Sequence, residues 1–194
     1  MEMIKASGLK KYYVTDNYEV HALDGVSLSV EEGEFLAIIG TSGSGKTTLL
    51  QILGGLDEPT AGGVWIRGNS LKDMTEDERT IFRRRNIGFV FQQYNLIPVI
   101  NVYENIVLPL RLDGAEIDEK LLEDIVRTLK IGEKLENLPE ELSGGQQQRV
   151  AIARATPFPD RGMPPPSSCL RPPLSEMRSL LLYNFRLPDT LFRL

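Results

Sequence analysis

The chain has 194 residues, of which 41% are hydrophobic and 25% charged, a composition typical of one folded domain, and its net charge of −5 argues against a nucleic-acid-binding protein. One cysteine excludes a disulfide within the chain, and no apolar run is long enough to span a bilayer. Because the N-terminal residues also lack the apolar segment of a secretory signal, we expect a cytoplasmic protein.

The first predicted elements are strands and a helix around a glycine-rich loop. Two strands are predicted on either side of a turn at residues 31–33, and the second, residues 35–39, is continuously apolar, which is typical of a strand buried on both faces. Apolar positions in residues 46–56 have helical spacing. A short strand and turn are expected in residues 62–71, and a further strand in residues 87–92.

The second half of the chain has helical patterns. Asn101 and Glu104 resemble a capping box that starts a helix, and Pro109 should limit this helix. Residues 116–132 carry an apolar stripe at helical spacing that ends at a glycine. The pattern S-x-x-Q at residues 143–146 starts another helix, which two prolines should end. Strands followed by a helical block indicate an α/β core with an inserted helical subdomain.

The composition changes abruptly inside this last helical pattern. Residues 1–155 hold 17 Lys and Arg and 24 Asp and Glu, whereas residues 156–194 hold five Arg, three acidic residues and eight of the 12 prolines. Such a shift marks a boundary. We expect a folded domain at 1–155, with its helical subdomain at roughly 95–150, and a disordered proline-rich tail at 156–194.

The segment GTSGSGKT matches the phosphate-binding pattern G-x-x-x-x-G-K-[ST]. Its glycines allow a tight turn that aims successive amides at phosphate oxygens, and the following helix adds the positive end of its dipole. Lys46 should reach the β- and γ-phosphates, and the Thr47 hydroxyl should ligate Mg²⁺. A chance glycine-rich turn is the alternative, but a strand precedes the segment and a helix follows it. The predicted nucleotide contacts here are Gly40, Thr41, Ser42, Gly43, Ser44, Gly45, Lys46, Thr47 and Thr48.

The phosphate loop and three further motifs occur in the order that is typical of one family. Residues 1–155 resemble the ATP-binding subunit of an ABC transporter. LSGGQ at residues 142–146 is similar to the family signature, and Gln92 to the glutamine that contacts Mg²⁺ and the attacking water. Tyr12 lies where the family has an aromatic that stacks on adenine, with Tyr13 as the alternative. The resemblance implies a P-loop NTPase with an antiparallel β subdomain, and Lys46 and Gln92 as its catalytic residues.

In this family two subunits pack head to tail, so each ATP lies between one phosphate loop and the partner's signature. The resemblance implies ATP and Mg²⁺ as cofactors, a second ATP-binding subunit, a separate transmembrane permease, no nucleic acid, and a place on the inner face of the cell membrane. A helix N-terminus with glycines suits a γ-phosphate, although a plain capped helix is the alternative. The residues expected to contact the partner's ATP are Ser143, Gly144, Gly145 and Gln146.

Sequence around these motifs resembles ATPases that serve lipoprotein release, macrolide export and resistance to antimicrobial peptides. Family members continue with an apolar strand that ends in Asp and then Glu, and later with a switch histidine. Residues 156–194 hold no such pattern, because Asp160 and Glu176 stand alone. The only histidine, His21, precedes the phosphate loop, so we expect it to have a structural role. The catalytic Glu and switch His are therefore predicted to be absent, the central sheet incomplete and hydrolysis impaired.

A shifted reading frame, a mis-joined gene and a degenerate protein are three open explanations of the tail. The function predicted first is an ATP-hydrolysing subunit of a bacterial export system. A nucleotide-binding or vestigial module without turnover is the alternative, and a soluble ABC ATPase of DNA repair or translation is less favoured. Arginines 83–85 are predicted to lie on a solvated helix face rather than at a docking site.

Overall fold

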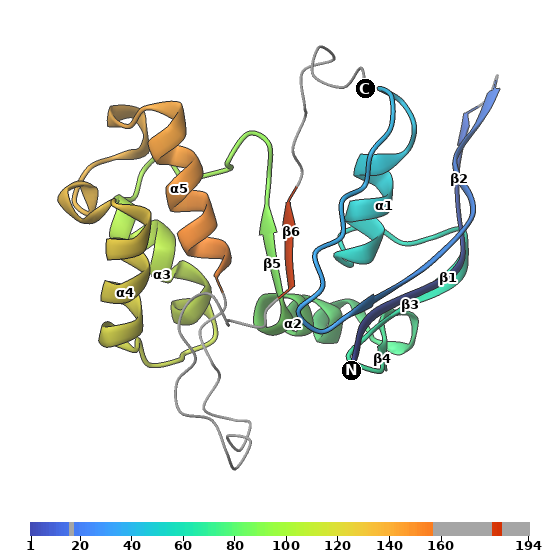
Figure 1. The fold of residues 1–194 in the computed structure, drawn as a ribbon, viewed down its shortest axis with the longest axis horizontal. Coiled ribbons are helices and arrows are strands. Elements are labelled where there is room, and N and C mark those ends of the chain that lie inside the picture. The colour runs from blue at the N-terminus through green and yellow to red at the C-terminus, as the bar shows by residue number, and fades with distance from the viewer. Residues whose placement is uncertain (16–17, 157–179, 184–194) are drawn as a thin grey trace. The chain divides into compact units, whose positions relative to one another are not determined.

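The computed structural model of the chain describes residues 1–15, 18–156 and 180–183, the last of these as backbone only. The chain divides into two compact units, Met1–Arg83 and Arg84–Leu194. Figure 1 shows the order of the elements along the chain.

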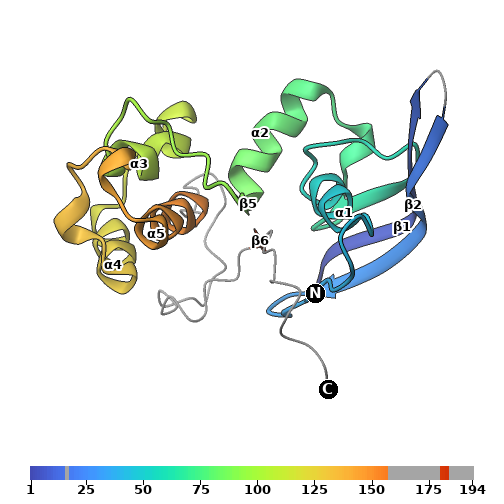
Figure 2. The ribbon, with the colours of Figure 1, turned by 90° about the horizontal axis from the view of Figure 1, so that it is seen from above.

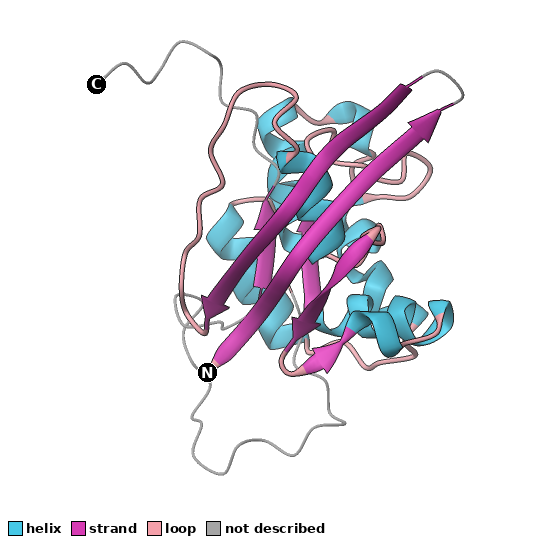
Figure 3. Ribbon diagram, turned by 90° about the vertical axis from the view of Figure 1, so that its right-hand side faces the viewer, coloured by secondary structure: helices cyan, strands magenta, loops and turns pink. Residues whose placement is uncertain are grey.

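The first unit is built on an antiparallel sheet. Its strands are β1 (Glu2–Thr15), β2 (Tyr18–Glu31), β3 (Ala61–Ile66) and β4 (Asn69–Ser70), in the order β2-β1-β3-β4. All three pairings are antiparallel, and the long ribbon of β1 and β2 dominates the view in Figure 3. This sheet confirms the predicted antiparallel β subdomain, and β3, the turn and β4 confirm the strand and turn expected in residues 62–71.

Helix α1 (Lys46–Leu53) covers this sheet, as Figure 2 shows. It ends three residues before the predicted end because Gly55 adopts a left-handed conformation with φ 65°, and the amide of Leu56 donates to the carbonyl of Gln51. Each fully buried Leu or Ile side chain in such a core contributes about 1.5–3 kcal/mol. The most deeply buried side chains of the unit are Ile4, Leu9, Ile52, Leu53 and Ile66.

The prediction of a buried strand at residues 35–39 is wrong. These residues form a loop between β2 and α1, and the side chains of Phe35 and Ile39 are 92% and 79% exposed. A strand needs a neighbouring strand to satisfy its backbone N–H and C=O groups, and neither sheet in the described part of the chain includes this segment. An apolar run shows that a segment can be buried, but it does not show that a partner strand exists.

The first unit is completed by a 3₁₀ turn at Leu71–Asp73 and by most of helix α2 (Glu76–Asn86), whose last residues belong to the second unit. The second unit then begins a short sheet. Strand β5 (Ile87–Val90) pairs in parallel with β6 (Leu180–Tyr183). Strand β5 ends two residues before the predicted end at residue 92.

Three helices form the main core of the second unit: α3 (Val102–Leu112), α4 (Glu119–Leu129) and α5 (Gly144–Ala155), with 3₁₀ turns at Gly132–Lys134 and Pro139–Glu141. They confirm the predicted helical block, and together with both sheets they give the α/β fold class. The buried residues of this core are Val102, Ile106, Val107, Leu122, Ile125, Val126, Val150 and Ala153 from the helices, with Ile131 and Leu142 from the segments between them.

Local capping signals proved reliable, but the predicted helix limits were less so. Both capping boxes are present, at Asn101 for α3 and at Ser143 for α5. Helix α3 continues three residues past Pro109, because proline removes one hydrogen bond without preventing those of the following turn. Helix α4 ends at a left-handed cap, Lys130, before the predicted glycine, whereas α5 ends at Ala155 as predicted.

Residues 156–194 were predicted to be disordered. The structure has a strand there, β6, so this prediction is wrong for residues 180–183. Residues 157–179 and 184–194 lie outside the described residues. Asp160 and Glu176 are among them, so the predicted absence of an Asp-Glu pair concerns residues that the structure does not describe. The boundary at residue 155 therefore stays a prediction.

Candidate nucleotide-binding site

The phosphate loop joins the loop after β2 to helix α1, which begins at Lys46. Gly43 and Gly45 have φ of 80° and 82°, a left-handed conformation that glycine adopts without strain. A Cβ at Gly45 would lie 2.2 Å from the carbonyl oxygen of Ala22, so only glycine fits there. Gly45 caps α1 without any side-chain hydrogen bond, which leaves the helix's first amides and its positive dipole end available to an anion.

The Lys46 ammonium group lies inside this loop. Its Nζ donates hydrogen bonds to the carbonyls of Gly40 and Thr41, at 2.7 and 2.6 Å, and to the Ser44 hydroxyl at 3.2 Å. A phosphate oxygen is a stronger partner than a neutral carbonyl, because charge-assisted hydrogen bonds are roughly twice as strong. Lys46 is therefore placed to exchange these internal contacts for a bound phosphate.

The residue after Lys46, Thr47, carries an oxygen atom of the kind that Mg²⁺ prefers as a ligand. Thr47 lies in the first turn of α1 with its side chain exposed, and a hydroxyl is a hard oxygen ligand. No cluster of three or more His, Cys, Asp and Glu side chains is present among the described residues. The donor set fits an ion held mainly by nucleotide phosphates and water, and it does not fit a metal caged by protein ligands.

Tyr12 on β1 stacks on His21, its cross-strand partner on β2. Their ring centroids are 4.0 Å apart and the rings are inclined by 21°. The Tyr12 hydroxyl donates to Asp24 Oδ1 at 2.7 Å, and this hydrogen bond, followed by contact with Lys10, holds the pKa of Asp24 below its usual value. These contacts fix the plane of the Tyr12 ring. The structural role of His21 stays a prediction, and its place against the aromatic was missed, because the register of β1 and β2 sets it.

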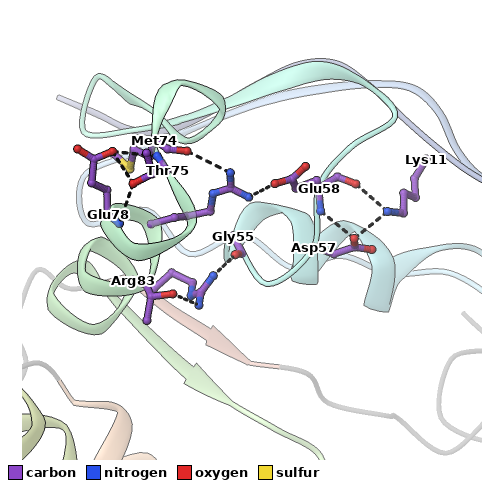
Figure 4. A network of polar contacts seen from close by, with 10 residues as sticks. Lys11, Gly55, Asp57, Glu58, Met74, Thr75, Glu78 and Arg83 are labelled. Carbon is purple, nitrogen blue, oxygen red and sulfur yellow. Dashed lines mark hydrogen bonds and ion pairs between the residues drawn. The ribbon is translucent and has the colours of Figure 1, made fainter.

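The other candidate aromatic, Tyr13, belongs to a separate polar network, most of which Figure 4 shows. Its hydroxyl donates to Asp57 Oδ2 at 3.1 Å, and Lys11 Nζ donates to Asp57 Oδ1 at 2.7 Å. Burial by itself would raise the pKa of Asp57, but hydrogen bonds from Lys11 and the Glu58 amide and the charge of Lys11 hold it below its usual value. Both tyrosines thus donate a hydroxyl hydrogen bond to an aspartate, so Tyr12 stays the predicted stacking residue and Tyr13 its alternative.

The same network reaches α2, where Arg79 pairs with Glu58 and donates to the Met74 carbonyl at 3.2 Å. Arg83 donates to the Gly55 carbonyl at 2.6 Å.

In the second unit, Arg84 Nη1 lies 2.6 Å and Arg85 Nε 3.5 Å from the carboxylate of Asp113. None of these three arginines is buried, although each makes an intramolecular contact, so their assignment to a solvated helix face rather than a docking site stays a prediction.

The structure brings the predicted adenine and phosphate contacts together in the first unit. Tyr12 pairs with His21 across the ribbon, and the next residue of β2, Ala22, directly touches Gly45 at the start of α1. The aromatic platform and the phosphate loop are thus joined through two consecutive residues of one strand. That these residues hold the two ends of one nucleotide stays a prediction.

Two predicted site elements lie in the second unit. Gln92 is exposed and follows the end of β5 by two residues. At the start of α5, the Ser143 amide donates to Gln146 Oε1 at 2.8 Å, and the Gln146 amide donates to Ser143 Oγ at 3.3 Å. The Gln146 side chain is thereby engaged in the cap, while a Cβ at Gly145 would meet open space. A phosphate could approach the exposed glycine backbone at this helix end.

The chain matches the sequence model of the ABC transporter family over residues 23–157. It is 45% identical over 159 residues to the macrolide export ATP-binding/permease protein MacB of Syntrophobacter fumaroxidans, covering 80% of this chain and 22% of that protein. It is 47% identical over 160 residues to the lipoprotein-releasing system ATP-binding protein LolD of Aquifex aeolicus, covering 79% of this chain and 68% of that one. The predicted resemblance to macrolide-export and lipoprotein-release ATPases is confirmed.

A solved dimeric structure of the ABC transporter cassette MJ0796 of Methanocaldococcus jannaschii matches with a TM-score of 0.72 and 46% identity, covering 79% of this chain and 68% of that chain. A second structure of that cassette, in a post-hydrolysis state bound to ADP and Pi, matches with a TM-score of 0.71 and 45% identity. None of the helices in the described ranges is long and apolar enough to cross a membrane. The chain belongs to the ABC transporter family, of which it carries the ATP-binding domain.

Proposed function

We propose that this chain binds Mg-ATP as the nucleotide-binding subunit of a bacterial export system, on the inner face of the cell membrane, where it powers a separate transmembrane permease. The observation that supports the proposal is the left-handed Gly45 against the Ala22 carbonyl at the start of α1, with the Lys46 ammonium inside the same loop. The names of the LolD and MacB relatives support lipoprotein release or drug export as the kind of process served.

Each predicted residue has a part in this proposal. Tyr12 stacks on adenine, while Lys46 and the loop amides hold the phosphates. Thr47 is the side chain of the first unit that holds Mg²⁺, which neutralises phosphate charge when it is bound, and the same role is expected of Gln92 from the family resemblance alone. The exposed glycines that start α5 contact ATP on a second copy packed head to tail, which the dimeric state of the MJ0796 cassette supports.

For this chain as it stands, the alternative of nucleotide binding without efficient turnover has specific support. The sequence after Ala155 lacks the apolar run with Asp-Glu that positions metal and water in the family. Phosphoryl transfer depends on positioning and electrostatic stabilisation, and help from a general base is typically worth about 10²–10⁴ in rate. We therefore propose that ATP binds and is hydrolysed slowly.

The test compares phosphate release from Mg-ATP by the full chain and by a chimera in which a family-like tail replaces residues 156–194. We expect release by the chimera to be faster by about 10² or more. Equal rates would contradict the proposed role of the missing carboxylates. Nucleotide binding by neither protein would contradict the proposed function itself.

A further inference from the structure

The segment after Gln92 contains an unusual turn. Tyr94 and Asn95 both have left-handed backbone conformations, with φ of 60° and 48°. Asparagine tolerates this region, but tyrosine enters it only when surrounding contacts hold it there. Within the turn, the Tyr94 amide donates to the Phe91 carbonyl at 3.1 Å and the Asn95 amide donates to the Gln93 carbonyl at 2.6 Å. Contacts from outside the turn can add to the stabilisation of this conformation.

Arg154, in the last turn of α5, supplies that stabilisation. Its Nη2 donates to the Tyr94 carbonyl at 2.8 Å and its Nη1 donates to the Asn95 carbonyl at 2.7 Å. The two parallel donors of a guanidinium fork match two consecutive carbonyls only when both peptide units are held in one orientation. Burial also lowers the pKa of Arg154.

A second contact ties the same turn to α5. Tyr94 packs against the small cluster of Val90, Ala151 and Ala155, and its hydroxyl lies 3.5 Å from the position of a Cβ at Gly144. Tyr94 therefore touches α5 near its beginning, and Arg154 holds the turn from the end of the same helix.

We propose that Arg154 is a positioning residue, which locks the turn at residues 94–95 and thereby fixes where Gln92 presents its amide. The helix that begins with the signature residues and the segment that carries Gln92 then move as one body. The mechanical part of this proposal stands on the contacts alone. Its consequence for Mg²⁺ rests on the proposed function of Gln92.

The chain offers suitable variants. Arg154→Lys keeps the positive charge and most of the stem but replaces the fork with a single ammonium, whereas Arg154→Ala removes both. Arg127→Lys is the matched control, because Arg127 is an arginine of the same unit whose exposed guanidinium pairs with Asp124 on the surface of α4. Circular dichroism of all three variants establishes whether the helices remain folded.

The first measurement is hydrogen exchange by mass spectrometry on the full chain. In Arg154→Lys, we expect peptides covering residues 91–96 to exchange about tenfold faster or more, while peptides from α3 and from residues 144–150 keep their protection. The Arg127 control should match the parent throughout. Unchanged exchange at 91–96, or an equal rise across α3 and α5, would overturn the proposal.

The second measurement is the Mg²⁺ concentration needed to tighten binding of a fluorescent ATP analogue. In Arg154→Lys this concentration should rise several-fold, about three- to tenfold, while the affinity without Mg²⁺ stays that of the parent. An unchanged Mg²⁺ requirement would overturn the link to Gln92. Failure of the parent to bind nucleotide would count against the proposed function instead, and the exchange result would still decide whether Arg154 holds the turn.

Discussion

Replacing Asn105 with leucine should destabilise the helical part of the chain strongly. Asn105 on α3 is fully buried, and its Nδ2 donates to the carbonyls of Ile97, Ile100 and Asn101 at 3.1, 3.1 and 3.0 Å. Its Oδ1 accepts from the Ile97 amide at 2.8 Å. One buried amide thus fastens the loop that links residues 92–95 to α3.

The expected magnitude follows from the groups that Asn105→Leu leaves unpaired. The Asn101 carbonyl keeps its bond from the Asn105 backbone amide, so three backbone groups of Ile97 and Ile100 lose their partner. At about 1 kcal/mol for each bond, the loss is about 3 kcal/mol. Leucine has the same number of side-chain heavy atoms as asparagine, so the change leaves no cavity, and any overpacking by its bulkier methyl groups adds to this loss.

Urea unfolding of the full chain, followed by circular dichroism, measures this loss. With a typical slope of about 2 kcal/mol/M, the midpoint should fall by about 1.5 M. The control is Asn137→Ala, which removes one partly exposed hydrogen bond to Glu141 and should cost at most about 0.5 kcal/mol. A midpoint for Asn105→Leu as close to the parent as that of the control would refute the reasoning.

Three other predictions concern the site and its supports. Tyr12→Ala should weaken binding of ATP about tenfold and leave binding of inorganic triphosphate unchanged, because stacking of a base on an aromatic is worth about 1–3 kcal/mol; calorimetry with both ligands checks this. Ser143→Ala should lower the free energy of unfolding by about 1 kcal/mol through loss of the α5 cap, which urea titration measures. Folding lowers the pKa of Asp57, so the Asp57 carboxylate stabilises the fold above the unfolded pKa of 3.8, and this stabilisation is lost as the pH falls below that value. The difference in unfolding free energy between the parent and Asp57→Asn should therefore shrink at low pH, and a constant difference would contradict this.

The features that could be predicted from sequence are local ones. The left-handed Gly45 before Lys46 and the Ser143 cap depend on residues within a few positions of each other, so their patterns are visible in the sequence. The confirmed helical block likewise follows from short-range patterns, whereas the antiparallel sheet was expected from the family resemblance, and no local pattern predicted its strand β1. The roles assigned to the predicted site residues are still predictions.

The features that were missed depend on partners far along the chain. Residues 35–39 have the composition of a buried strand, but burial needs a neighbour that the segment itself does not encode. Arg154 meets carbonyls 59 and 60 positions away, and its residue type alone does not indicate that contact. Only the register of β1 and β2 reveals that His21 supports Tyr12.

The central claim is that residues 40–48 bind the phosphates of ATP through the Lys46 ammonium. The most direct test is equilibrium binding of a fluorescent ATP analogue to the full chain, to Lys46→Ala, and to Lys120→Ala as a control for an exposed lysine on α4. A hydrogen bond to a charged group is worth about 1.5–3 kcal/mol, so Lys46→Ala should weaken binding about tenfold or more, while Lys120→Ala binds like the parent. Equal affinity of the parent and Lys46→Ala would contradict the account.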